Sequence, residues 1–254
     1  MTNSFQLENL DVHIFETKAD LGARAAQFVS EKLSAALEKN GAATLILATG
    51  ASQFEFLDSL KHENIDWSRI TVFHLDEYKD MSIEHPASFR KYLKERILAD
   101  VKPAQVYYLH GDAPDTDAVV QRYEHLLKQY DIDVACIGIG ENGHLAFNDP
   151  PVADFDDPKL VKVVELDETC RRQQLGEGWF PTLEDVPTHA LSLTIPAIMR
   201  ARVISCVVPD ERKAKAVHDA LYGEISTACP ASILRRHEGA VLWLDRGSAS
   251  LIEV

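Results

Sequence analysis

The chain has 254 residues, enough for one large α/β domain or two small ones with a substantial core. Its 40 acidic and 26 basic residues give a formal net charge of −14. This charge argues against nucleic acid as the main partner, because phosphate backbones bind to basic surfaces, but it leaves an anionic small molecule possible.

Apolar side chains recur at helical spacing in some segments and form short runs in others. Helices are predicted at residues 18–39, 52–60, 85–98, 115–130 and 211–221, with Pro86 in the first turn of the third. Strands are predicted at residues 44–48, 70–75, 106–109, 133–139, 188–195, 203–208 and 240–244. The pattern over residues 153–187 is weak.

This alternation of strands and helices indicates βαβ units. We expect a doubly wound, mostly parallel sheet flanked by helices, a Rossmann-like α/β fold. No repeat, low-complexity tract or linker divides the chain. A single domain over residues 1–254 is therefore predicted.

The cysteines and the N-terminus indicate a compartment. Cys136, Cys170, Cys206 and Cys229 lie far apart without a C-x-x-C pair, which favours free thiols in a reducing environment. Residues 1–10 lack the apolar core of a signal peptide, and no apolar run is long enough to cross a bilayer. We expect a soluble, cytoplasmic protein with no membrane partner.

Four polar clusters, at residues 49–52, 76–78, 141–149 and 209–213, each follow a predicted strand. The carboxyl ends of parallel strands share one edge of a sheet, and ligands bind at that edge. We therefore expect these clusters to meet in one site, which favours an enzyme over four unrelated solvated loops.

His144 lies among short acids and amides in the third cluster. A lone histidine is usually a core residue, but a neighbour that fixes one ring nitrogen frees the other to exchange protons. A metal site combining His144 with His74, His85 or Asp76 lacks tight ligand spacing, so no metal is expected.

The same turn matches the dinucleotide pattern G-x-G-x-x-G at Gly138, Gly140 and Gly143, with Glu165 as the ribose-binding acid. That fingerprint needs a helix behind the third glycine, whereas prolines follow at 150–151. It also belongs on the first βα unit of a chain. No nucleotide cofactor is expected.

The other clusters have two interpretations each. Asp76 is either part of a solvated turn or cap, or a base whose pKa the sheet edge raises. The loop at 49–52 either caps a helix through Ser52 or offers its N–H groups to a phosphate. Lys213 is either exposed, as most lysines are, or a ligand for the same anion.

Through these clusters, the sequence resembles the glucosamine-6-phosphate deaminase (isomerase) family, whose superfamily includes 6-phosphogluconolactonase. The likeness spans most of the chain in the right order. It rests on F-H-L-D-E-Y (73–78), E-H-P-A-S-F (84–89) and G-I-G-E-N-G-H-L-A-F-N-D-P (138–150), with weaker support from L-A-T-G-A-S (47–52), Lys213 and P-A-S-I-L (230–234).

Two positions favour the deaminase branch. Lactonases of the superfamily tend to carry Asp-Glu-Arg where this chain has Asp-Glu-Tyr at 76–78. They also tend to carry Thr-Ala-Ser where it has Leu-Ala-Phe at 145–147.

The resemblance implies a cofactor-free conversion of an amino-sugar 6-phosphate to a ketose 6-phosphate and ammonia. Asp76 would move a proton between C2 and C1, and His144 would open the sugar ring. The implied supporting residues are Asp149 and Asn142 beside the histidine and, around the phosphate, Thr49, Gly50, Ala51, Ser52, Lys213 and Arg172.

The chain departs from the family at several of these positions. Asn142 replaces an Asp, and Asp149 replaces a longer Glu, so its reach to His144 is expected to need a water or a backbone shift. The family's phosphate-binding arginine aligns with Leu175, which makes Arg172 the substitute. The gluco or galacto configuration of the substrate stays open.

Two other functions fit the same residues. One is a sugar-phosphate lactone hydrolase in which His144 activates water. The other is a non-catalytic sugar-phosphate sensor, which the substitutions at 142 and 149 suggest. The sequence is compatible with a homo-oligomer, but subunit contacts leave no readable pattern in it.

Overall fold

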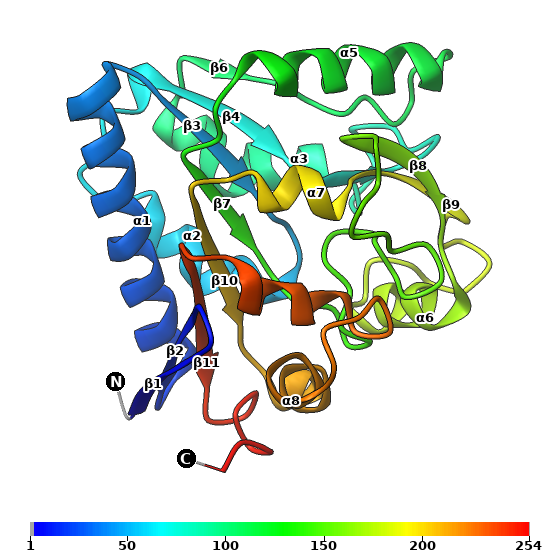
Figure 1. Ribbon diagram of the computed structural model, residues 1–254. Helices are drawn as coiled ribbons and strands as arrows, with labels where there is room; N and C mark the ends of the chain where they lie inside the picture. Colours follow the sequence, from blue (N-terminus) through cyan, green and yellow to red (C-terminus); the bar gives the residue numbers. More distant parts are fainter. Residues whose placement is uncertain (1–2, 254) are drawn as a thin grey trace.

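An eight-stranded sheet forms the centre of the molecule (Figure 1). The computed structural model describes residues 3–253, so Met1, Thr2 and Val254 of the predicted 1–254 domain lie outside it. The strand order is β1-β2-β11-β10-β7-β3-β4-β6. The strands are β1 (Asn3–Leu7), β2 (Leu10–Phe15), β3 (Ala43–Leu47), β4 (Ile70–His74), β6 (Gln105–Val106), β7 (Val134–Ile137), β10 (Val203–Val208) and β11 (Ala240–Asp245).

The pairing confirms the predicted doubly wound, mostly parallel α/β architecture. Every pairing in the sheet is parallel except that of β1 with β2, a hairpin that the sequence pattern did not reveal. From β3 the chain proceeds outward to β4 and β6, then returns to β7 on the other side of β3. The strand order therefore reverses between β3 and β7, where ligand sites form in such folds.

Helices cover both faces of the sheet. One face packs against α1 (Lys18–Asn40), α2 (Phe54–Leu60) and α3 (Phe89–Leu93) with its continuations η3 (Lys94–Leu98) and α4 (Ala99–Val101). The other packs against α5 (Thr116–Gln129), α7 (Ile195–Met199), α8 (Ala214–Tyr222) and the 3₁₀ segment η5 (Pro230–Arg236). The remaining short 3₁₀ turns are η1 (Ala51–Gln53), η2 (Trp67–Arg69) and η4 (Glu211–Lys213).

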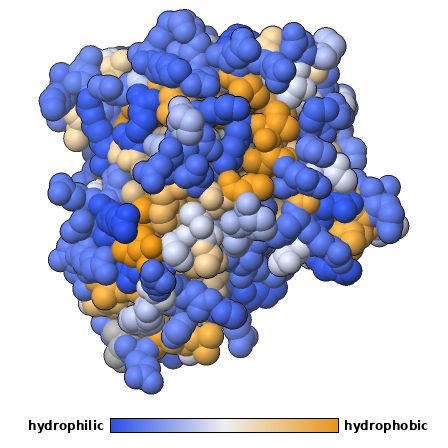
Figure 2. Space-filling model, turned by 45° about the vertical axis from the view of Figure 1, so that its right-hand side comes forward, coloured by the Kyte–Doolittle hydropathy of each residue, from blue (hydrophilic) through white to orange (hydrophobic). Residues whose placement is uncertain are grey.

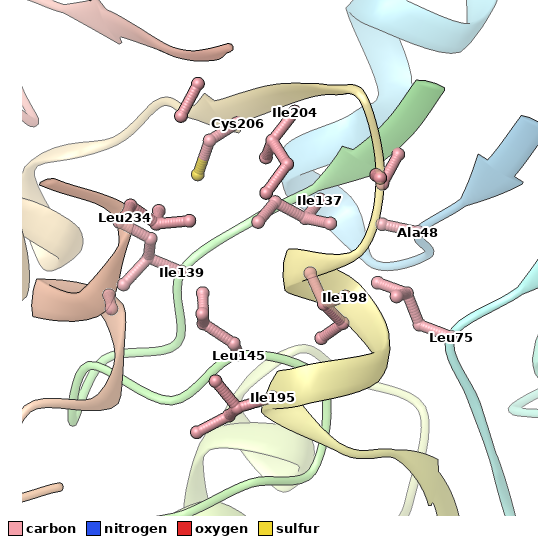
Figure 3. Close-up of a cluster of buried hydrophobic side chains, with 14 of the residues drawn as sticks. Ala48, Leu75, Ile137, Ile139, Leu145, Ile195, Ile198, Ile204, Cys206 and Leu234 are labelled. Atoms are coloured by element: carbon pink, nitrogen blue, oxygen red, sulfur yellow. The ribbon is translucent and has the colours of Figure 1, made fainter. Parts of the chain in front are cut away.

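The central strands are apolar on both sides because both faces are covered. In β7, Ala135 and Ile137 join the cluster under α5, α7 and α8, whereas Val134 and Cys136 join the one under α1 and α2. Figure 3 shows the first cluster, in which side chains of the sheet meet those of α7 and of the turn after β7. The labelled members are Ala48, Leu75, Ile137, Ile139, Leu145, Ile195, Ile198, Ile204, Cys206 and Leu234.

A second, three-stranded sheet contains part of the weakly patterned region. It pairs β5 (Asp76–Tyr78), β9 (His189–Leu193) and β8 (Val161–Glu165) in antiparallel fashion, next to α6 (Glu168–Gly176) (Figure 1). The prediction of β9 as a strand is confirmed, but β5, β8 and α6 were not predicted. The strand β8 has only five residues, and its buried side chains, Val161 and Val164, are three positions apart, so it lacks the two-residue period by which strands are predicted.

The start of the third predicted helix is corrected. The helix begins at Phe89, with Ser88 as its N-cap, and its Oγ accepts a hydrogen bond from the backbone N–H of Lys91. Pro86 therefore lies in the preceding turn and not in the first turn of the helix. A serine cap fits the start of a helix better than the proline does, because its side chain satisfies a free backbone donor.

The hydrophilic surface and the free cysteines match what the charge and the cysteine spacing predicted. Most of the face in Figure 2 is hydrophilic, with apolar side chains gathered near its middle. All four cysteines are free, and Cys136, Cys170 and Cys206 are buried. Among residues 3–253, no helix has the length and apolar character needed to cross a membrane.

Candidate active site

A cleft opens where the strand order reverses, with about 550 Å³ of empty space that includes open solvent at its mouth. Its walls come from the carboxyl ends of β3, β4, β7 and β10, which confirms that the four polar clusters share one edge of the sheet. The residues that line it are Ala48, Thr49, Gly50, Ser52, Leu75, Asp76, Phe89, Gly138, Ile139, Gly140, His144, Ala146, Phe147, Gln173, Gln174, Glu177 and Lys213.

Asp76 presents an unpaired carboxylate to this cleft. Its side chain is buried, 7 % exposed, and makes no hydrogen bond or ion pair with any residue between 3 and 253. Burial, and then the negative charge of Glu77, raise the pKa of Asp76 well above its ordinary value. A carboxylate with these properties is a strong base toward a bound ligand.

The opposite side of β5 is fastened to α3. Glu77 is fully buried, and its carboxylate accepts hydrogen bonds from the N–H groups of Tyr78 (2.9 Å), Phe89 (3.2 Å) and Arg90 (3.1 Å). The Ser88 hydroxyl (2.8 Å) and the Arg90 Nε (3.1 Å) donate to it as well. Because successive side chains of a strand alternate, this anchor fixes the direction of the unpaired carboxylate next to it.

Breaking this anchor is expected to cost far more stability than breaking an exposed ion pair. Arg90→Met leaves the Glu77 carboxylate buried without its cation, so we expect a loss of about 3–5 kcal/mol in the free energy of unfolding. The double variant Glu77→Gln/Arg90→Met removes both charges and should lose less. Urea denaturation measures both. The control is Arg69→Met, whose half-exposed pair with Asp66 is worth at most about 1 kcal/mol. Equal losses in the two single variants would contradict this assignment.

His144 and Asp149 form a hydrogen-bonded pair in the turn after β7. The Asp149 Oδ1 accepts from His144 Nδ1 at 2.8 Å and from Asn142 Nδ2 at 2.8 Å, while Asn142 Oδ1 accepts the His144 backbone N–H at 3.1 Å. Asp149 reaches the ring directly, so the water that was expected as one way to bridge the two is not needed. The tight turn, with Gly143 at φ +85° and Ala146 at φ +50°, brings the carboxylate directly to the ring.

This pairing sets up the ring for proton transfer. Burial pushes the pKa of Asp149 upward, but the hydrogen bond and charge of His144 outweigh it, so the net pKa is lowered and the acid stays ionised. An ionised Asp149 holds a proton on Nδ1. The Nε2 atom has no hydrogen-bond partner within residues 3–253 and belongs to a side chain that lines the cleft.

The space beside this ring requires a glycine. A Cβ atom at Gly140 would lie 2.2 Å from Cε1 and Nε2 of His144. We expect Gly140→Ala to displace the ring from Asp149 and to cost about 1–3 kcal/mol in the free energy of unfolding, as overpacking does. Gly176→Ala, at a helical position with open space, should be neutral or gain up to about 1 kcal/mol. Similar urea midpoints for the two variants would show that the position of the His144 ring does not require a glycine at residue 140.

Lys213 contributes an unpaired positive charge. The side chain is only 6 % exposed, and its ammonium makes no hydrogen bond or ion pair with the residues that the structure describes. Burial lowers its pKa, which the charges of Glu177 and Glu141 partly oppose. A buried ammonium without a partner is costly, so the site favours an anionic ligand.

The loop after β3 lines the cleft next to Lys213. Gly50, at φ +97°, turns the chain into η1 and α2, and the Tyr92 hydroxyl holds its carbonyl oxygen at 2.8 Å. Thr49, Gly50 and Ser52 line the cleft, whereas Ala51 lines an adjoining cavity together with Ser52 and Lys213. A helix start facing a buried lysine is a typical arrangement for binding one phosphate.

Arg172 lies apart from these groups. Its side chain is 63 % exposed on α6 and pairs with Glu168, so its predicted place beside the anion site is corrected. The reason is helical phase: residues 168 and 172 share the outer face, while Gln173, Gln174 and Glu177 face the cleft. These three side chains were not identified as site residues from the sequence. Only their spacing within the weakly patterned region could have indicated that they share one helix face.

The structure also shows where the residues considered for a metal site and for dinucleotide binding lie. His74 Nε2 accepts the N–H of Leu109, its burial lowers its pKa to about 3, and it does not line the cleft; nor does His85. Ligand atoms of His144, Asp149 and Cys170 lie within 4.8 Å of one another, but burial raises the pKa of the Cys170 thiol, which disfavours a metal-binding thiolate. Turns, and no helix, follow Gly143, so the dinucleotide fingerprint lacks its helix N-terminus.

Comparisons with known proteins identify the family of this chain. Residues 16–243 match the family of glucosamine-6-phosphate isomerases and 6-phosphogluconolactonases. A glucosamine-6-phosphate deaminase of Exiguobacterium sp. (strain ATCC BAA-1283 / AT1b) is 37 % identical, over 95 % of this chain and 91 % of the relative. One of Bacillus cereus (strain B4264) is 36 % identical over 82 % and 78 %.

Solved structures share the fold. A monomeric glucosamine-6-phosphate deaminase superposes with a TM-score of 0.85 at 31 % identity, covering 94 % of this chain and 99 % of that one. The 6-phosphogluconolactonase of Trypanosoma brucei superposes with a TM-score of 0.78 over 99 % of this chain and all of that one, at 19 % identity. The second likeness concerns the fold alone.

Proposed function

Because the chain belongs to the family of glucosamine-6-phosphate isomerases and 6-phosphogluconolactonases, we propose that it converts an amino-sugar 6-phosphate to a ketose 6-phosphate and ammonia. Glucosamine 6-phosphate is the first candidate substrate, since it is the one in the names of the relatives. The observation that carries the proposal is one cleft holding an unpaired carboxylate, a histidine–carboxylate pair and an unpaired ammonium.

The phosphate end of the substrate fits the anion site. Lys213 supplies the positive charge, and the loop at 49–52 supplies polar groups at the start of a helix. This placement directs the sugar ring toward the acids and the histidine deeper in the cleft. The ammonium and the helix start both place positive charge on this side of the cleft.

His144 is suited to opening the sugar ring. Asp149 fixes its Nδ1, so Nε2 exchanges the proton that moves between the O1 hydroxyl and the ring oxygen. The product is the open-chain aldehyde with its amine on C2. Asn142 keeps this pair in place through its two hydrogen bonds and needs no charge to do so.

Asp76 is suited to the isomerisation. Its carboxylate takes the proton from C2, and the C–H electrons form the C1–C2 double bond while the carbonyl electrons move to O1. O1 takes a proton from the ammonium group on C2, and return of the Asp76 proton to C1 then gives a hydroxyl at C1 and an iminium at C2. Water adds there, ammonia leaves, and the ketose 6-phosphate results, so that one water is consumed for each ammonia released. The reaction is hydrolytic in this sense and needs no cofactor.

A side-by-side turnover assay tests the proposal. Glucosamine 6-phosphate, galactosamine 6-phosphate and 6-phosphogluconolactone are supplied separately, and ammonia and ketose phosphate are measured. We expect equal amounts of ammonia and fructose 6-phosphate from the gluco substrate. Lactone hydrolysis without ammonia release, or saturable binding without turnover, would contradict the proposal and favour a hydrolase or a sensor. Sugar phosphates are retained inside cells by their charge, so we expect the enzyme in the cytoplasm.

A further inference from the structure

Gln174 is held in the wall of the cleft by the strand that carries Asp76. The Tyr78 hydroxyl donates a hydrogen bond of 2.6 Å to Gln174 Oε1, and both side chains are buried. Tyr78 follows Asp76 by two residues in β5, so their side chains lie on the same face of the strand. The hydrogen bond therefore ties α6 to the face of β5 that presents the carboxylate.

This contact fixes which end of the Gln174 amide remains available. Its oxygen is occupied by Tyr78, while its nitrogen has no hydrogen-bond partner among residues 3–253. The side chain is 6 % exposed and lines the cleft. The amide nitrogen keeps access to the open cleft, so a ligand bound there can supply the acceptor that the protein does not.

The neighbouring glutamine does not share this property. Gln173 Oε1 accepts the backbone N–H of Glu141 at 2.9 Å, and its Nε2 donates to Glu177 Oε1 at 3.3 Å. Both ends of that amide are used within the protein. Of these two glutamines, only Gln174 has an amide nitrogen that makes no hydrogen bond to any residue in the described range 3–253.

We propose that Gln174 is a catalytic residue that donates a hydrogen bond to O1 of the open-chain substrate; this rests on the proposed deaminase reaction. When Asp76 removes the C2 proton, the electrons of the carbonyl π bond move to O1, which becomes an enolate oxygen. The proton stays on Asp76 until it returns to C1. A neutral amide donor beside this oxygen stabilises the developing charge without competing for the proton.

The position of Gln174 selects O1 over the phosphate as its acceptor. Tyr78 connects it to the strand of Asp76, where the C2 proton is handled. The phosphate is held by Lys213 and the loop at 49–52, which come from β10 and β3. A donor tied to β5 therefore faces the reacting end of the sugar.

Steady-state kinetics test the inference. Gln174→Leu is expected to lower kcat by about 10²-fold while KM changes by less than about threefold, because the hydrogen bond matters mainly in the transition state. Tyr78→Phe leaves the Gln174 amide in place but removes the hydrogen bond that orients it, so kcat is expected to fall by only about tenfold. Gln121→Leu, an exposed glutamine of α5, is the control and should match the wild type. A wild-type kcat in Gln174→Leu would overturn the inference.

Ligand binding separates catalysis from a structural role and does not depend on turnover. The first probe is 2-amino-2-deoxyglucitol 6-phosphate, which has no carbonyl at C1. The second is a phosphorylated sugar hydroxamate that mimics the enolate. Gln174→Leu should bind the first as the wild type does and the second about 10²-fold more weakly. Equal loss for both probes would overturn the inference, whereas failure of the wild type to release ammonia would instead reject the proposed reaction.

Discussion

An Asp76→Asn variant is expected to lose activity and to gain stability. The amide cannot take the C2 proton, so kcat on glucosamine 6-phosphate should fall by about 10³–10⁴-fold, the upper range for a general base. The same change removes a buried carboxylate that has no partner in the described part of the chain. We expect the free energy of unfolding at pH 7 to rise by about 1–3 kcal/mol.

The gain should depend on pH in a defined direction. Burial raises the pKa of Asp76 in the folded protein, so its contribution to stability is fully present below the pKa of an unfolded aspartate, about 3.9, and is lost as pH rises through the folded pKa. The advantage of the variant should therefore be largest at neutral pH and shrink toward pH 3.

Urea denaturation at several pH values, together with the ammonia assay, tests both effects of this substitution. The control is Asp11→Asn, at an exposed position of β2. It should change the free energy of unfolding by no more than about 0.5 kcal/mol and kcat by no more than about twofold. A variant at position 76 that stays active would show that another group is the base. One that is inactive but destabilised would show that the carboxylate has a partner.

A Lys213→Met variant is expected to lose affinity for the phosphate end of the substrate. The methionine fills similar space but leaves the anion without its cation. We expect binding of a sugar phosphate to weaken by about 10²–10³-fold, which corresponds to roughly 3–4 kcal/mol. Because the unpaired ammonium is also costly to bury, the variant should unfold at a higher urea concentration than the wild type.

The affinity for the phosphate group can be measured without turnover, from the binding of inorganic phosphate in competition with a sugar phosphate. The wild type should bind phosphate ever more weakly as pH rises toward the lowered pKa of Lys213, since only the charged ammonium attracts the anion. Lys39→Met, at the exposed end of α1, is the control and should bind as the wild type does. If the position 213 variant kept its affinity for phosphate, the anion would bind elsewhere.

The sequence predicted the positions whose local pattern is strong. The apolar run of β7 followed by a glycine turn placed His144 at the edge of the sheet, and the residues after β3, β4 and β10 were expected at the same edge. These expectations depend only on strand ends in a parallel sheet, which short apolar runs mark well. The resemblance then gave each cluster a role.

The missed features depend on contacts between distant segments. Nothing local in the sequence shows that β5 and α3 bury Glu77 and Arg90 together. Gln174 faces the cleft and Arg172 does not, a difference of two positions that only the phase of α6 decides. Lys213 is buried by its surroundings in the fold, whereas most lysines that begin a helix are exposed.

The structure of a complex with 2-amino-2-deoxyglucitol 6-phosphate tests the central claim most directly. This open-chain alcohol cannot react, so it reports where each end of the substrate lies. The account predicts a phosphoryl group between Lys213 and the loop at 49–52, with C2 beside Asp76 and the O5 hydroxyl near His144. A phosphoryl group bound elsewhere, or carbons facing away from Asp76, would contradict the account.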